Sequence, residues 1–163
     1  MVFQAAKLDF LTSQTLFQSN IANLKLDFLS FFGYNIQMEY KPQNIEFTKP
    51  EIHKKGWGKE VWICNSPDYC GKILVFEKGK KCSAHMHGKR EHLYLIKGKI
   101  ELIHFNLFTG EELKVILEQG SIIHIPPFAP HQFIALEDSE FIEFSTQHFE
   151  DGSFRIGKGD SQA

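Results

Sequence analysis

The stretch GKKCSAHMHGKREHLYLIKG, residues 79–98, decides the fold that we expect for this chain. Five of its residues stand at the offsets G-x5-H-x-H-x3-E-x6-G, namely Gly79, His85, His87, Glu91 and Gly98. Residues two apart on a β-strand point to the same side, so His85 and His87 are expected to share one face. Glu91 follows a short turn and can face the same interior from the next strand. The two glycines suit the tight turns that would end these strands.

A third histidine, His131, ends the stretch GSIIHIPPFAPH, residues 120–131. By parity with Phe133 and Ala135 it can point into the same interior. Three imidazoles and one carboxylate form a good ligand set for a divalent transition metal with open positions. We therefore predict a site for one Zn, Mn, Fe, Ni or Co ion, held by His85, His87, Glu91 and His131. Cys82 is expected on the face opposite His85 and is not counted as a ligand.

Short runs rich in Ile, Val, Phe and Leu surround these motifs, with turn residues between them. They are residues 61–64, 72–78, 91–97, 99–105, 113–118, 121–126, 131–136 and 140–145. Many short strands at regular spacing indicate a sandwich or a barrel. The fold class predicted for residues 46–150 is therefore mainly β.

The two ends of the chain have a different texture. Apolar residues at gaps of three to five, from Leu8 to Phe32, predict an N-terminal helical extension over residues 1–45. Its role is open between a helix packed on the main fold and a dimer arm or lid. Residues 151–163 end polar and rich in Gly, so we expect a C-terminal tail on the surface or a strap across a neighbour.

Composition excludes several classes of partner. Of 163 residues, 42% are hydrophobic and 23% charged, and the net charge of -2 comes with no basic patch, so nucleic acid is not an expected partner. No stretch approaches the ~18 apolar residues of a membrane span, and the first residues lack the pattern of a signal peptide. Three cysteines without a C-x-x-C pair are read as reduced thiols. These observations predict a cytoplasmic protein.

The stretch 79–98 resembles the first sequence motif of the cupin superfamily at all five positions. The second cupin motif, G-x5-P-x-G-x2-H-x3-N, is matched by Gly120, Pro126 and His131, while Phe128 replaces the Gly and Ala135 the Asn. Neither departure removes a ligand. The resemblance covers about residues 56–147 and implies a jelly-roll β-barrel, a homodimer, and the metal ligands named above.

Residues 56–92, GWGKEVWICNSPDYCGKILVFEKGKKCSAHMHGKREH, further resemble the cupin domain of bacterial mannose-6-phosphate isomerases, and the stretch 141–162 resembles small sugar-isomerase cupins. This implies a metal-dependent isomerase whose substrate is a small sugar or sugar phosphate.

Isomerisation of an aldose to a ketose needs a base that is not itself a metal ligand. Glu143, which shares a strand face with Phe141 and Ser145, is the candidate base. Lys72 is the candidate group that stabilises a developing enediolate. Lys89 and Arg90 can hold a phosphate, and Trp57 and Trp62 can stack on a sugar. The remaining histidines, which are expected on the walls or at the rim of the barrel, are not predicted to be metal ligands.

Two other functions stay open at this point. The same ligands suit an Fe(II)-dependent dioxygenase, since apolar residues (Phe76, Leu93, Phe133) flank the site. A non-catalytic carbohydrate-binding cupin is the other, because one barrel type can serve many roles.

Overall fold

A computed structural model describes residues 44–162, and the predicted helical extension lies almost wholly outside the described residues. Eleven strands and one short 3-10 turn make up the described part of the chain. The strands are β1 (Glu51–Lys55), β2 (Gly58–Asn65), β3 (Cys70–Phe76), β4 (Ala84–His87), β5 (Glu91–Lys97), β6 (Lys99–Phe105), β7 (Glu112–Glu118), β8 (Ile122–Ile125), β9 (His131–Ala135), β10 (Ser139–Ser145) and β11 (Ser153–Gly157). The 3-10 turn is η2 (Asp160–Gln162).

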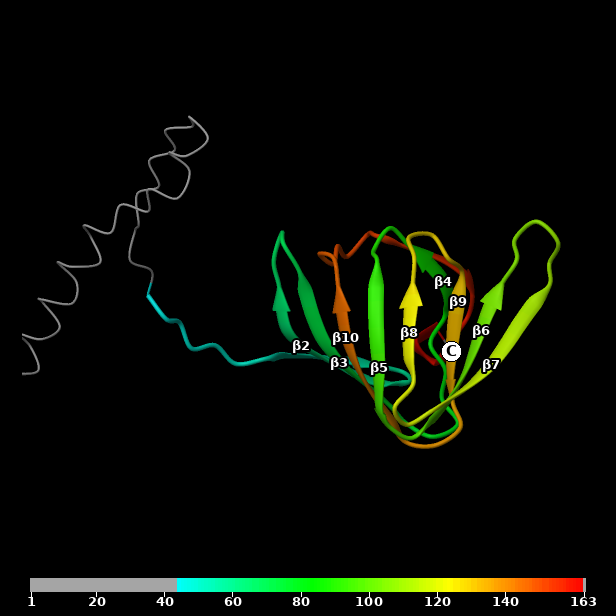
Figure 1. Cartoon of the computed structure of the whole chain (residues 1–163), viewed down its shortest axis with the longest axis horizontal. Coiled ribbons are helices and arrows are strands. Elements are labelled where there is room, and N and C mark those ends of the chain that lie inside the picture. The colour runs from blue at the N-terminus through cyan, green and yellow to red at the C-terminus, as the bar shows by residue number, and fades with distance from the viewer. Residues whose placement is uncertain (1–43, 163) are drawn as a thin grey trace, which may run out of the picture. The chain divides into compact units, whose positions relative to one another are not determined.

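The strands form two antiparallel sheets. One has the order β1-β2-β3-β10-β5-β8 and the other the order β11-β4-β9-β6-β7. In Figure 1, β2, β3, β10, β5 and β8 stand side by side, while β4, β9, β6 and β7 form a second group. Strands consecutive in the chain often belong to different sheets, as in a jelly roll. The prediction of a mainly β fold is therefore confirmed for the described residues.

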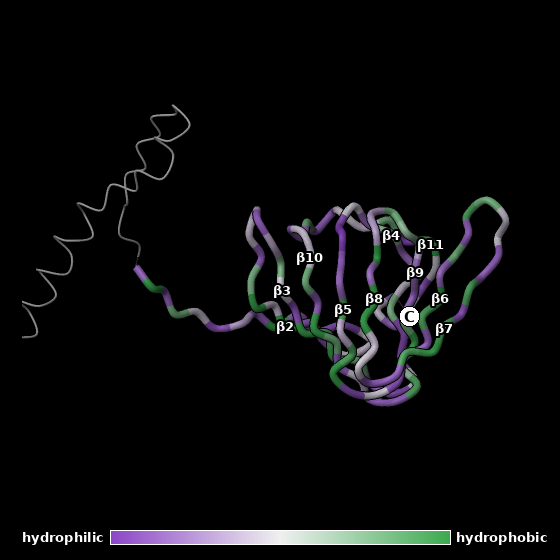
Figure 2. Tube along the Cα trace, in the orientation of Figure 1, coloured by the Kyte–Doolittle hydropathy of each residue, from purple (hydrophilic) through white to green (hydrophobic). Residues whose placement is uncertain are grey.

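Strand periodicity explains why these segments face one another. On β5, Glu91, Leu93 and Leu95 are buried, whereas His92 and Tyr94 between them are exposed. Polar and apolar colours likewise alternate along the strands in Figure 2. Gly98 has φ 87° between β5 and β6, and a Cβ there would meet the Ser139 hydroxyl, so only glycine fits this turn.

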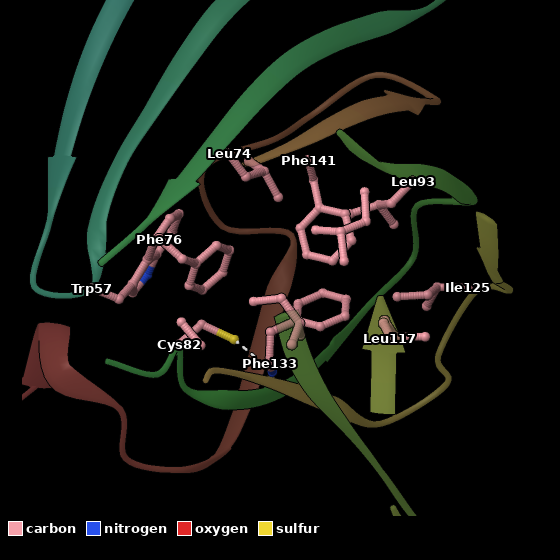
Figure 3. Close-up of a cluster of buried hydrophobic side chains, with 12 residues drawn as sticks. Trp57, Leu74, Phe76, Cys82, Leu93, Leu117, Ile125, Phe133 and Phe141 are labelled. Carbon is pink, nitrogen blue, oxygen red and sulfur yellow. Dashed lines mark hydrogen bonds between the residues drawn. The ribbon is translucent and has the colours of Figure 1, made fainter. Parts of the chain in front are cut away.

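The core lies between the sheets. Aromatic and aliphatic side chains from both sheets point toward one another, as Figure 3 shows for Phe76, Phe133 and Phe141. The ring centroids of Phe133 and Phe141 lie 5.2 Å apart, and those of Trp57 and Phe76 lie 4.2 Å apart. Apolar burial of this extent is the main stabilising contribution to such a barrel.

The C-terminal region differs from the expected polar tail. Residues 153–157 form β11, which pairs with β4 so that Arg155 lies opposite His85. Beyond it, the Asp160 carboxylate accepts a hydrogen bond of 2.6 Å from the Lys81 backbone N–H, and Gly159 packs against the backbone of Cys82. This segment is a strap across its own barrel. The segment is attached by backbone hydrogen bonds rather than by an apolar pattern in its sequence SFRIG.

Between residues 44 and 162, no helix has the length and apolar character needed to cross a membrane.

Candidate metal centre

Three histidines converge inside the barrel from two neighbouring strands. His85 and His87 lie on β4, and His131 begins β9 directly opposite His85. Their ring centroids are 4.5 to 5.4 Å apart. The atoms that they offer as ligands all lie within 4.8 Å of one another. The spacing H-x-H thus places two imidazoles on one face, and strand pairing adds the third.

Backbone carbonyls hold two of these rings. The Nδ1 of His85 lies 2.8 Å from the carbonyl oxygen of Ser83, and the Nδ1 of His131 lies 2.9 Å from that of Ala129. In both, Nε2 remains free to face the cluster. This is the usual arrangement of metal-binding imidazoles, whose second nitrogen is fixed by a backbone acceptor.

The histidine cluster favours neutral rings. Burial lowers the pKa of His131 to about 4, and the nearby His85 acts in the same direction. Burial likewise lowers the pKa of His85. Since an imidazole must be deprotonated to bind a metal, the lowered pKa values of His85 and His131 favour metal binding by these two residues at neutral pH.

Glu91 lies beside the cluster at the start of β5. Its Oε2 is 3.2 Å from the Nε2 of His87, and its Oε1 is 2.6 Å from the Nζ of Lys89. Burial would raise the pKa of Glu91, but the hydrogen bond with His87 and the charge of Lys89 outweigh it, so the pKa is lowered. The donor set of three imidazoles and one carboxylate fits a divalent transition metal.

Lys89 connects two carboxylates, a contact that the sequence did not indicate. Its Nζ donates to Glu91 and, over 2.8 Å, to Oε1 of Glu143, which is 54 residues away in the chain. The sequence predicted that Lys89 could hold a phosphate, but Lys89 is largely buried and its charge is paired with these two carboxylates. The charges of Glu143 and Glu91 overcome the effect of burial and raise the pKa of Lys89.

Glu143 faces the same cavity from β10. It is 3% exposed and accepts a second hydrogen bond, of 2.8 Å, from the Ser145 hydroxyl. Burial raises the pKa of the Glu143 carboxyl, and the charge of Glu91 raises it further against the opposing charge of Lys89. The shared face of Glu143, Phe141 and Ser145 that the strand pattern predicted is present.

Lys72 enters the cavity from β3, next to Glu143 in the register. It is 2% exposed, and its Nζ lies 3.4 Å from Oε2 of Glu60 and 3.3 Å from Nδ1 of His148. The charge of Lys72 helps lower the pKa of Glu60 against the effect of burial. Lys72 therefore lies in the cavity, but as half of an ion pair.

A cavity of about 90 Å³ contains this constellation, with the histidines and charged groups on one side. Its opposite side is apolar and formed by Trp57, Leu74, Phe76, Cys82, Leu93 and Phe133. Cys82 precedes β4, so strand parity does not apply to it, and it lines the same cavity as His85. Burial raises the pKa of its thiol to about 12, which leaves it protonated and a poor ligand.

The two tryptophans are not free to stack on a sugar. Trp57 is 6% exposed and stacks on Phe76 in the core. Trp62 has the ammonium of Lys72 4.1 Å from its ring centroid, and its centroid lies 4.4 Å from that of His53. Trp57 therefore belongs to the core at the wall of the inner cavity, whereas Trp62 is half-buried and lines neither that cavity nor its larger neighbour.

Comparison with known proteins agrees with this architecture. Residues 72–145 match the family model described as Cupin domain. Oxalate decarboxylase from Bacillus subtilis superposes with a TM-score of 0.62 at 18% identity, over 72% of this chain and 33% of the other. CapF, a capsular polysaccharide assembling protein from Staphylococcus aureus, gives 0.59 at 14% identity, over 66% of this chain and 34% of the other. No curated protein matches.

The chain thus spans about a third of the solved structures that it resembles. Likeness at this identity shows the fold. One of the oxalate decarboxylase structures concerns Mn(II) centres in that enzyme. The family model covers residues 72–145, and the solved structures share the fold of this barrel. The mannose-6-phosphate isomerase subtype is a finer assignment that these comparisons do not make.

Proposed function

We propose that this protein is a metal-dependent isomerase of a small carbohydrate, with His85, His87, Glu91 and His131 as the metal ligands. The observation that carries the proposal is Glu143. It is a buried carboxylate in the same cavity as the three histidines, and its hydrogen-bond partners are Lys89 and Ser145 rather than a histidine. A ligand set together with a separate carboxylate base is what proton transfer next to a carbonyl group requires.

The bound ion would supply Lewis acidity, polarising the carbonyl and hydroxyl oxygens of the sugar. The chain's own residues do the rest. Glu143 takes the proton from the carbon beside the carbonyl, and the electron pair of that C–H bond becomes part of the enediol double bond. Glu143 exchanges this proton with solvent and returns a proton to the former carbonyl carbon, while the proton of the neighbouring hydroxyl moves to the former carbonyl oxygen. No oxidant or co-reactant is consumed.

Lys89 and Ser145 support this role because both hydrogen-bond Oε1 of Glu143 and hold the carboxylate in place. A carboxyl whose pKa is raised is a better base and acid near neutral pH than an ordinary one. Lys72 lies close enough in the register to stabilise negative charge that develops on the substrate. The apolar side of the cavity limits the access of water to the enediolate.

The proposal is tested by Glu143→Gln, with Glu140→Gln as the matched control. Glu140 lies on the same strand but on the outer face, where it pairs with Lys97. We expect Glu143→Gln to keep its metal and to lose turnover by about 10²–10⁴-fold. The control should retain both. The measurement combines metal analysis with NMR of a panel of aldoses and ketoses in D₂O, in which proton transfer through an enediolate introduces deuterium.

Unchanged turnover in Glu143→Gln would remove this residue from the mechanism. Sugar binding without any turnover in the parent protein would instead favour a carbohydrate-binding cupin.

The Fe(II)-dependent dioxygenase remains the second candidate because the cavity has a continuous apolar side, which suits an apolar substrate and O₂. Iron in the purified protein, together with O₂ uptake, would favour it over isomerisation.

The homodimer and the cytoplasmic location also stay predictions. A row of six apolar residues on the outer face of the six-stranded sheet supports a homodimer. Each is the register partner of the next, and they are Ile52, Val61, Ile73, Ile142, Tyr94 and Ile122. Ile52, Tyr94 and Ile122 are 62%, 42% and 72% exposed, which is a large apolar surface for a single sheet face.

A further inference from the structure

A second, larger cavity of about 340 Å³ lies next to the metal centre, and we call it the vestibule. It shares His87, Lys89, His148 and Ser153 with the inner cavity, so the two adjoin. The loop after β10 and the start of β11 form much of its wall. A substrate that reaches the histidines would therefore leave its distal part in the vestibule.

Both lysines along this path are already neutralised. Lys89 pairs with Glu91 and Glu143, and Lys72 pairs with Glu60. No other lysine or arginine among residues 44–162 lines either cavity. Arg90 and Arg155, which could have served a phosphate, are exposed and line neither. His148 does not replace them, because burial and Lys72 lower its pKa to about 4.

The remaining vestibule wall is neutral and rich in hydrogen-bonding groups. Thr146, Gln147 and Ser153 offer hydroxyl and amide groups that match sugar hydroxyls. Phe149 is 58% exposed and offers an apolar ring to the C–H face of a sugar. Next to it, Glu150 and Asp151 are exposed acidic residues that repel anions.

We infer that the substrate is an unphosphorylated sugar, whose distal hydroxyls occupy the vestibule, rather than a sugar phosphate. The inference rests on the proposed isomerase function and names its substrate class. Phosphate-binding sites present free guanidinium or ammonium groups or helix N-termini to the dianion. The vestibule offers a phosphate dianion none of these from the described part of the chain.

The test compares the full chain, carrying the metal with which it is purified, on matched ligands. D-mannose, D-fructose and D-xylose are each titrated against the ester that carries a phosphate on the terminal hydroxyl, with binding followed by calorimetry and ligand-observed NMR. We expect at least one free sugar to bind at least about tenfold more tightly than its phosphate ester, and inorganic phosphate not to compete. Tighter binding of an ester, competition by phosphate, or binding of neither form would overturn the inference.

Two variants examine the vestibule itself. Phe149→Ala should weaken binding of the free sugar by about tenfold, while Phe154→Ala, equally exposed on β11 at 56% but outside both cavities, should leave it unchanged. Gln147→Lys adds the missing cation and should shift preference toward the phosphate ester. Equal effects of the two phenylalanine variants, or no shift with Gln147→Lys, would contradict the assignment of the vestibule.

The same measurements separate this inference from the proposed function. Turnover of a phosphate ester would leave the isomerase in place and overturn the substrate class. Tight binding of free sugars without turnover would uphold the substrate class and overturn the isomerase.

Discussion

The two ends of the barrel interior are built by the same strands but carry opposite chemistry. Along β5 the inward residues change from Glu91 to Leu93 and Leu95, and along β9 from His131 to Phe133 and Ala135. Strand β10 follows the same order, from Ser145 and Glu143 to Phe141. Each strand therefore contributes to a polar end, which holds the candidate metal centre, and to an apolar end, which holds the core.

Both ends are equally hidden from water, so burial alone does not separate them. The apolar end is stabilised by packing, as in the aromatic cluster of Phe76, Phe133 and Phe141. The polar end buries charges, which is costly unless they are paired, and every buried carboxylate there has a partner. We conclude that the apolar end supplies most of the stability and the polar end holds the candidate metal ligands, and mutations can separate the two.

Removing two of the predicted metal ligands should have the largest effect, and that effect should be confined to the polar end of the barrel. We expect His85→Ala combined with His87→Ala to reduce metal content from about one equivalent to none, because only two of four ligands remain. Elemental analysis of the purified protein measures this, with His104→Ala, outside both cavities, as the control. Full metal occupancy in the double variant would refute the site assignment.

Creating a cavity at the apolar end should lower the stability of the fold instead. Phe141→Ala removes a side chain that is 0% exposed, and we expect a loss of about 3–5 kcal/mol in the free energy of unfolding. Phe144→Ala, on the same strand but 61% exposed, should cost less than about 1 kcal/mol. Denaturant unfolding gives both values. If Phe141→Ala folds but releases its metal, the two ends are coupled more strongly than we infer.

Acidification should weaken the metal-free protein through the polar end. The pKa of His131 and that of His148 are both lowered to about 4, from an ordinary value of 6.5. As the pH falls from 6.5 toward 4, the unfolded chain binds protons that the folded one does not, so stability is lost in that window, by about 3 kcal/mol for the buried His131 and by less for the half-buried His148. Thermal unfolding in chelator should show a shallower pH dependence for His148→Gln than for the parent protein, and an equal dependence would contradict this account.

Backbone strain near the polar end should give the smallest effect. Phe128 has φ 62°, the only positive φ of a non-glycine residue between residues 44 and 162, in the loop before His131. The left-handed conformation costs a residue with a side chain roughly 1–2 kcal/mol, and glycine avoids this strain. Because glycine also loses more conformational entropy on folding, Phe128→Gly should raise the free energy of unfolding by only about 0.5–1 kcal/mol. Gly120→Ala, at φ 91° with open space around it, should change stability in the opposite direction. If denaturant unfolding shows that both variants change the free energy of unfolding in the same direction, Phe128 is not strained.

Phe128 also shows how far motif comparison reaches. It replaces the glycine of the second cupin motif, and the backbone nevertheless keeps the conformation that glycine would prefer. The loop is positioned by its surroundings, including a hydrogen bond of 2.7 Å from the Phe128 N–H to the carbonyl oxygen of His87. A departure from the motif therefore changed the local energy and not the path of the chain.

The amino-acid sequence by itself predicted the strands from β5 to β10 closely, and the convergence of the three histidines. The reason is that alternation along a strand and H-x-H spacing are local properties, set by residues two apart. Glu91 and the shared face of Glu143 and Phe141 followed from the same rule. Strands β1 and β11 were not predicted, because EIHKK and SFRIG have no clear apolar alternation and are held by pairing with neighbours.

Only the tertiary structure decided which charges meet. The sequence predicted Lys72 as a charge-stabilising group and Lys89 as a phosphate-binding residue, but it did not indicate their partners Glu60 and Glu143, which lie 12 and 54 positions away. Closure of the two sheets brings these groups into one cavity from which water is largely excluded, where each charge must find an opposite one. Pairing of this kind depends on distances across the barrel rather than on spacing along the chain, and within residues 44–162 it leaves neither cavity lined by an unpaired lysine or arginine.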